Sequence, residues 1–265
     1  MRAGATARHR TALLPDAADP ARATSASIRR PRRGLAVRAV GLAGELLLTG
    51  GVLLALFVVW QVWWTDVVAA REQRATVTAM EDSYTVPEVL EPARARTEEP
   101  PPEVRAVSEG EPFATLHVPR WGRDYEVPIT EGVGTDVLDT GAAGHYPDTA
   151  LPGEIGNFAL AAHRQTYGAA FRYVDTLEVG DPLIVETADA WLVYRVREDY
   201  IVEPDKVEVL APTPNQPDVP ATERLITFTT CHPLWSTAQR WITHGVFERW
   251  IPRSEGVPAE LLQDG

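Results

Sequence analysis

The chain has 265 residues, of which 45% are hydrophobic and 23% charged, enough for one large folded domain or two small ones. This composition excludes a wholly disordered chain. The single cysteine, Cys231, excludes an intrachain disulfide framework and a cysteine-rich zinc or iron–sulfur site. The net charge of −12 argues against a nucleic-acid binder, because such a protein needs a basic face. We expect neither a cofactor nor a metal.

The charge is distributed unevenly along the chain. Residues 1–38 carry nine arginines against Asp16 and Asp19, a formal charge of +7, so the remaining residues carry −19. A basic segment before an apolar stretch is a topology signal and can contact anionic lipid, and we prefer this reading to nucleic-acid binding. The chain is therefore basic at one end only.

An apolar stretch covers residues 40–64, where Glu45, Thr49 and Gln61 are the polar side chains. At about 1.5 Å per residue, a helix over residues 46–64 is roughly 28 Å long, close to the ~30 Å hydrocarbon core of a bilayer. Three tryptophans cluster at its far end, and the arginines at its near end indicate the cytoplasmic side. We predict a single uncleaved membrane span with an extracytoplasmic C-terminal region. A cleaved signal peptide is the alternative, but the stretch is long, begins late and lacks a small-residue cleavage site.

The region after the span divides into a stalk, a linker and a folded domain. Residues 66–80 fit a short helix or stalk. Residues 86–112 hold six prolines and seven glutamates against three arginines, which favours an extended, self-repelling spacer. The predicted organisation is a basic cytoplasmic tail (1–39), a transmembrane anchor (40–64), a stalk and Pro/Glu-rich linker (65–112), a catalytic domain (113–254) and a C-terminal tail (255–265).

The domain is predicted to be mostly β. Short runs rich in Val, Ile, Thr and aromatic residues alternate with Gly, Pro and Asp, which is typical of strands separated by turns. The expected strands cover residues 113–118, 125–129, 157–162, 182–186, 190–196, 200–202, 224–229 and 240–250, with one short helix at 135–140. About eight strands in one domain favour a closed or nearly closed barrel, or a sandwich.

The lone cysteine is the first candidate for chemistry. Free thiols outside the cell usually oxidise or pair, so an unpaired Cys231 is unusual there. It follows the apolar strand at 225–230, where a rigid scaffold ends and a loop begins, a common position for a nucleophile. A buried, inert cysteine is the alternative. Arg240 opens the next expected strand, and two strands joined by the intervening loop would bring it beside Cys231, where it could favour a thiolate or hold an oxyanion.

A proton-transfer group with a pKa near neutrality is also required, and histidine is the usual choice. The six histidines are His9, His117, His145, His163, His232 and His244. Of these, His163 ends an apolar strand in the same way as Cys231, while His9 falls in the predicted cytoplasmic tail. Spacing alone leaves His163 either catalytic or structural.

Several motifs together resemble the sortase family. Ala161-Ala162-His163-Arg164, with the later Leu177-Glu178-Val179-Gly180-Asp181, is similar to the sortase histidine segment, and Thr227-Phe228-Thr229-Thr230-Cys231 is similar to its nucleophile strand. Arg240 falls where the family places its essential arginine. Cys231-His232-Pro233 together with Tyr167 looks most like class E sortases. Phe228 and Ala162 depart from the more usual Leu and Gly, which leaves the reacting groups in place.

The resemblance implies an eight-stranded sortase-type β-barrel carrying a cysteine transpeptidase site. Its catalytic residues would be Cys231, His163 and Arg240. Tyr167 and Thr230 are the candidate substrate-binding residues: Tyr167 is either a wall of the signal pocket or a packed loop aromatic, and Thr230 either supports the nucleophile or oxyanion or is a structural strand residue. The implied substrates are exported proteins with a C-terminal LAXTG- or LPXTG-like sorting signal, cut between Thr and Gly, and a cell-wall precursor amine such as lipid II. Class E implies LAXTG.

Three alternatives remain open from the sequence. Another Cys-His enzyme, such as an L,D-transpeptidase, usually carries a Ser-x-Gly-Cys element that residues 229–232 do not supply. A non-catalytic, membrane-tethered β-barrel would leave Cys231 buried and unreactive. A class C pilin polymerase would need an aromatic lid, which is not evident before residue 113.

Overall fold

The computed structural model describes residues 34–84 and 91–262. Most of the expected basic tail, including His9, lies outside these residues, as does part of the linker. The described chain divides into two units, one ending at Leu53 and the other beginning at Leu54.

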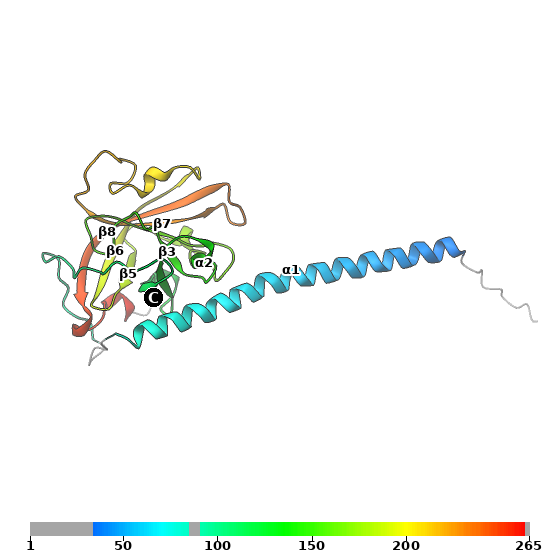
Figure 1. The fold of residues 1–265 in the computed structure, drawn as a ribbon, viewed down its shortest axis with the longest axis horizontal. Coiled ribbons are helices and arrows are strands. Elements are labelled where there is room, and N and C mark those ends of the chain that lie inside the picture. The colour runs from blue at the N-terminus through cyan, green and yellow to red at the C-terminus, as the bar shows by residue number, and fades with distance from the viewer. Residues whose placement is uncertain (1–33, 85–90, 263–265) are drawn as a thin grey trace, which may run out of the picture. The chain divides into compact units, whose positions relative to one another are not determined.

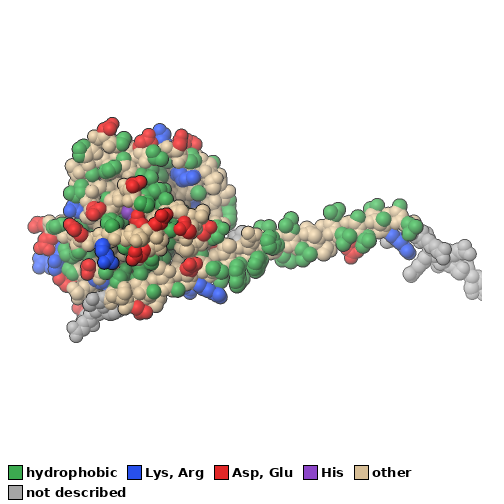
Figure 2. Space-filling view, viewed as in Figure 1, with side chains coloured by type: hydrophobic (Ala, Val, Ile, Leu, Met, Phe, Trp, Pro, Cys, Tyr) green, Lys and Arg blue, Asp and Glu red, His purple; other side chains and the backbone are tan. Residues whose placement is uncertain are grey.

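The N-terminal element is the helix α1 (Leu35–Glu81), which combines the predicted span and the predicted stalk in one continuous helix. The apolar side chains of its N-terminal part are exposed, including Leu47, Val59 and Trp63. Figure 2 shows hydrophobic side chains along α1, and carboxylates over the visible face of the domain. Among the described residues, α1 is the one helix that is long and apolar enough to cross a membrane.

The domain is a closed eight-stranded barrel, as predicted (Figure 1). The strands are β1 (Pro112–His117), β2 (Glu126–Glu131), β3 (Ala143–His145), β4 (Gly156–Ala161), β5 (Pro182–Glu186), β6 (Ala190–Val202), β7 (Arg224–His232) and β8 (Gln239–Pro252). Their order around the barrel is β1-β2-β3-β4-β7-β8-β6-β5. The β2/β3 and β4/β7 pairs are parallel and the remaining pairs are antiparallel.

Short helices complete the domain. They are α2 (Thr135–Leu138), η1 (Pro119–Trp121), η2 (Val174–Thr176), η3 (Val207–Leu210), η4 (Arg253–Glu255) and η5 (Ala259–Leu261). The helix expected at residues 135–140 is thus present, two residues shorter.

The barrel interior is filled by inward-facing side chains of the strands and by Phe171 of the loop after β4. Its largest fully buried members include Tyr194, Phe158, Phe171 and Phe228. The rings of Phe171 and Phe228 stack with centroids 4.5 Å apart, so Phe228 supplies core packing beside the cysteine strand. Burial of these aromatic rings on folding stabilises the end of β7 that carries Cys231.

Two strand predictions need correction. Residues 190–196 and 200–202 belong to one strand, β6, whose second half is exposed and pairs with β8 beyond the core, with a register shift between Val196 and Glu198. The strand β3 was missed because Ala143–His145 is short and contains glycine. Its pairing with both β2 and β4 defines it.

The described part of the linker differs from the expected free spacer. Arg96 exchanges backbone hydrogen bonds with Trp250 of β8, at N–O distances of 2.8 and 3.0 Å. The Trp250 indole donates to the carbonyl of Glu99 at 2.9 Å, and the Arg96 guanidinium pairs with Glu255 at 2.6 Å. The charge of Arg96 is therefore matched by a carboxylate that follows β8, and this part of the linker lies against the domain. Beyond residue 254, Val257 is buried against the barrel rather than exposed in a tail.

Candidate active site

Cys231 is the penultimate residue of β7. The preceding strand residues are buried, whereas Cys231 is half-buried and has a free thiol. The strand therefore fixes the cysteine backbone while leaving the sulfur within reach of solvent. A partly exposed thiol on rigid scaffolding is a suitable nucleophile.

Arg240 lies directly opposite Cys231 on β8. The two residues are register partners in the antiparallel β7/β8 pair. Side chains of opposite residues leave the same face of a sheet, with Cβ atoms about 4.5–5.5 Å apart. The Arg240 Nη1 donates to the carbonyls of Thr237 at 3.0 Å and Gln239 at 2.9 Å, which orients the guanidinium. The prediction that these strands bring Cys231 and Arg240 together is confirmed.

His163 follows β4, which runs parallel to β7. Ala161 is the register partner of Thr229, and the Ala162 N–H donates to the Thr229 carbonyl at 3.3 Å. His163 and Cys231 each come two residues after that pair. Parallel neighbouring strands lie about 4.8 Å apart and end at the same edge, so both residues emerge at one edge of the barrel.

Two side chains contact the His163 ring. The Asp139 Oδ1, just after α2, lies 2.8 Å from His163 Nε2. The Tyr167 ring lies 5.2 Å from the imidazole, centroid to centroid, at an interplanar angle of 30°. Tyr167 was singled out from the sequence as a substrate-binding candidate, but Asp139 was not. The sequence placed Asp139 on a short helix without a spacing that connects it to His163.

The loop that carries Tyr167 has an unusual backbone. Three successive residues have positive φ angles, 52° at Tyr167, 75° at Gly168 and 44° at Ala169. A left-handed conformation is unfavourable for residues with a side chain, so such a loop persists when its surroundings hold it.

Thr230 and Arg164 connect the histidine segment to the cysteine strand. The buried Thr230 hydroxyl donates to the carbonyl of Ala162 at 2.7 Å. Arg164, also buried, lies 3.2 Å from His232 Nδ1 and 3.5 Å from the Cys231 carbonyl, and it pairs with Asp175 at 2.9 Å. Arg164 belongs to the histidine motif, and no role for it follows from the sequence. The only signal was its position after His163.

The other described histidines are held in separate contacts. His117 pairs with Glu186 at 2.9 Å, and His145 with Glu131 at 2.7 Å. His244 lies in a buried network with Thr227 and Tyr200. These three histidines are buried, so they are structural members of the barrel wall.

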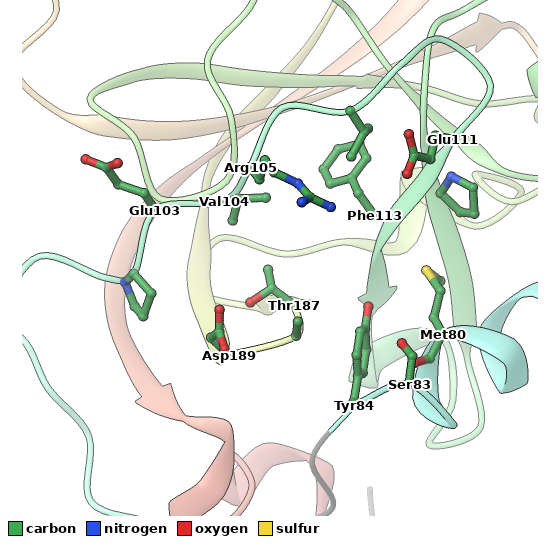
Figure 3. A pocket seen from close by; sticks show the side chains of 14 residues that line it. Met80, Ser83, Tyr84, Glu103, Val104, Arg105, Glu111, Phe113, Thr187 and Asp189 are labelled. Carbon is green, nitrogen blue, oxygen red and sulfur yellow. The ribbon is translucent and has the colours of Figure 1, made fainter.

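A pocket of about 360 Å³ lies elsewhere on the domain. Figure 3 shows Met80, Tyr84, Arg105 and Asp189 around it. None of its lining residues is a candidate site residue. The chemistry-bearing residues are therefore at the β4/β7/β8 edge and not in this hollow.

The β4/β7/β8 edge combines a thiol, an imidazole and a fixed cation. A thiol can form a covalent acyl intermediate, an imidazole can move the proton of a leaving or entering amine, and a cation can hold a developing oxyanion. This set of groups is suited to acyl transfer.

Comparison with known proteins agrees with this chemistry. The sortase domain model matches residues 116–248. The chain belongs to the sortase family, whose members are transpeptidase enzymes. The predicted sortase resemblance is thereby confirmed.

The most similar relatives include class E members. Sortase SrtE1 of Streptomyces coelicolor is 38% identical over 248 residues, covering 89% of this chain and 64% of that protein. The chain thus spans less than two thirds of the length of that relative. Sortase SrtE2 of the same organism is 36% identical over 230 residues, covering 83% of this chain and 86% of the relative.

Solved sortase structures match the domain. The SrtA sortase from Actinomyces oris has a TM-score of 0.61 and 47% identity, covering 64% of this chain and 98% of that chain. Sortase E1 from Streptomyces coelicolor, solved with a tripeptide in the active site, has a TM-score of 0.54 and 42% identity, covering 59% and 99%. The fold is common to these two structures, and the class E resemblance rests on SrtE1, SrtE2 and the sortase E1 structure.

Proposed function

We propose that this chain is a membrane-anchored sortase that attaches exported proteins to a cell-wall amine. Its substrates are proteins with a C-terminal LAXTG- or LPXTG-like sorting signal, and its acceptor is a cell-wall precursor amine such as lipid II. The observation that carries the proposal is the register pairing of Cys231 with Arg240, at the same edge as His163. The catalytic unit is residues 113–254.

In the first half-reaction, the Cys231 thiolate attacks the carbonyl carbon of the signal threonine. The carbon–sulfur bond forms, and the Arg240 guanidinium stabilises the tetrahedral oxyanion or binds the substrate backbone. The bond to the glycine nitrogen then breaks, and His163 gives that nitrogen a proton. The product is a thioacyl enzyme and a free glycine amine.

In the second half-reaction, the acceptor amine attacks the thioacyl carbonyl and His163 takes its proton. The carbon–sulfur bond breaks, which releases the Cys231 thiolate and leaves a new amide. Tyr167, in contact with His163, forms a wall of the signal pocket. Thr230 supports the bound peptide through the Ala162 backbone that its hydroxyl contacts.

The reaction is tested with the full chain in detergent, a fluorogenic LAXTG peptide and an amine acceptor. We expect an amide product with wild-type protein and none with Cys231→Ala or His163→Ala. Equal product from wild type and Cys231→Ala would refute the mechanism. Better turnover of LPXTG than of LAXTG would refute the class E preference alone.

We also propose that residues 1–39 are cytoplasmic, residues 40–64 cross the membrane and the domain is extracytoplasmic. Cys231 is the single cysteine of the chain and is half-buried, so it serves as its own topology probe. In intact cells, a membrane-impermeant maleimide should label the wild-type protein and not the Cys231→Ala protein. Labelling that appears only after lysis would contradict this orientation.

A further inference from the structure

The C-terminal part of α1 has one buried face within the same unit as the barrel. Asp66, Ala69, Gln73, Val77 and Met80 follow one another at intervals of three or four residues, which places them on one side of a helix. Ala69 and Val77 are 2% and 3% exposed. This side of α1 therefore packs against the domain rather than serving as a free stalk.

The helix approaches two loops of the domain at glycine residues. The Gln73 Nε2 donates to the Gly141 carbonyl at 2.6 Å, and a Cβ added at Gly141 would lie 2.7 Å from that nitrogen. The Gly168 N–H donates to Asp66 Oδ1 at 3.2 Å, and a Cβ added at Gly168 would lie 3.2 Å from the Ala69 Cβ. A side chain at Gly141 would displace the Gln73 amide, and one at Gly168 would crowd Ala69, so both loops approach α1 closely at a glycine.

These are the two loops that contact His163. Gly141 comes two residues after Asp139, which binds His163 Nε2, and Gly168 directly follows Tyr167, which packs on the imidazole. The Tyr167 loop is held in a left-handed backbone conformation and needs an external partner. Asp66 supplies one through the Gly168 N–H.

We propose that Asp66, Ala69 and Gln73 of α1 form a positioning face for His163, so that the membrane helix is part of the active-site scaffold. Gln73 holds the Asp139 loop and Asp66 holds the Tyr167 loop. The inference rests on the proposed role of His163 in proton transfer. Asp66 is two residues beyond Trp64, at the end of the proposed span, so one helix both anchors the protein and orders its catalytic histidine.

The test uses the full chain in lipid nanodiscs, with active protein counted by alkylation of Cys231. The variants are Asp66→Ala and Gln73→Leu, the second of which keeps the side-chain volume and removes the hydrogen bond to Gly141. We expect a roughly tenfold or larger fall in kcat, because small displacements of a catalytic group are costly, with KM for the peptide little changed. Asp66→Asn keeps an acceptor for the Gly168 N–H and should retain most of the wild-type kcat.

Glu72→Gln and Thr78→Ala are the matched controls, since both side chains are exposed on the same helix. We expect wild-type kcat from both. If the wild type depends on Cys231 and His163 while Asp66→Ala and Gln73→Leu equal the controls, the positioning role is refuted and the proposed function stands. If Cys231→Ala turns over like wild type, the proposed function itself fails. A fall in folded protein at unchanged kcat per active site would also refute the positioning role.

Discussion

His244 joins β8 to β7 and β6 through a buried chain of hydrogen bonds. The Thr227 hydroxyl donates to Asn157 Oδ1 at 2.6 Å, which leaves its oxygen to accept from His244 Nδ1 at 2.7 Å. The Tyr200 hydroxyl lies 2.6 Å from His244 Nε2 and donates to it. All of these hydrogen bonds form with a neutral imidazole, and they link the two strands that carry Cys231 and Arg240.

Burial, with a smaller contribution from the charge of Arg197, lowers the pKa of His244 to about 4 from its ordinary value of 6.5. The folded state therefore favours the neutral form of His244. The free energy of unfolding has its full value above pH 6.5, the ordinary pKa that His244 has in the unfolded chain. The free energy of unfolding decreases as the pH falls from 6.5 toward 4, because the unfolded chain binds a proton at His244 and the folded chain does not. At 1.36 kcal/mol per pKa unit, the loss is about 2 kcal/mol at pH 5 and about 3 kcal/mol near pH 4.

The assay is reversible urea unfolding of the full chain in detergent, followed by tryptophan fluorescence at pH 7 and pH 5. His244→Asn keeps a donor toward Thr227 and removes the titrating ring. The free-energy gap between wild type and His244→Asn should narrow by about 2 kcal/mol on going from pH 7 to pH 5. If the free energies of unfolding of the two proteins change in parallel over this pH range, the lowered pKa of His244 is not a source of pH-dependent stability.

Three further predictions concern the contacts around His163. Asp139→Ala should lower kcat roughly tenfold or more, at least as much as Gln73→Leu, because it removes the side chain that contacts His163 directly, and an unchanged rate would remove Asp139 from the site. Thr230→Val should lower the free energy of urea unfolding by about 1 kcal/mol, because the Ala162 carbonyl loses its donor, whereas Thr230→Ser should stay at wild type; equal losses would exclude the hydrogen bond as the cause. Arg164→Met should cost about 1 kcal/mol in the same assay, because it removes the hydrogen bonds of a buried guanidinium to the cysteine strand; wild-type stability would show that Arg164 does not tie the two segments together.

The barrel was predictable because most of its strands carry their own pattern. β4, β5 and β7 are apolar runs between turn residues, and their burial needs no knowledge of the partner strand. β3 carries no such pattern and exists through its neighbours β2 and β4. The second half of β6 is rich in polar residues because it extends past the core. There the strand is stabilised by its pairing with β8 and not by burial of side chains.

The residues of the site also fall into those that the local sequence predicts and those that it does not. Cys231 and Arg240 are nine residues apart on adjacent strands, so local sequence predicts their pairing. Asp139 and Gln73 reach the His163 surroundings through tertiary contacts across 24 and 68 residues, which no local pattern encodes. The linker contacts with Trp250 also depend on the fold, since composition alone predicts an extended chain.

Acylation of Cys231 is the step on which the proposed function depends. The full chain is incubated with a LAXTG peptide in the absence of an amine and examined by intact-mass and peptide-mapping mass spectrometry. We predict a hydroxylamine-sensitive acyl adduct of the peptide up to threonine on Cys231, which is absent from Cys231→Ala. Turnover of the peptide with no adduct on Cys231, or with the same adduct on Cys231→Ala, would contradict this prediction.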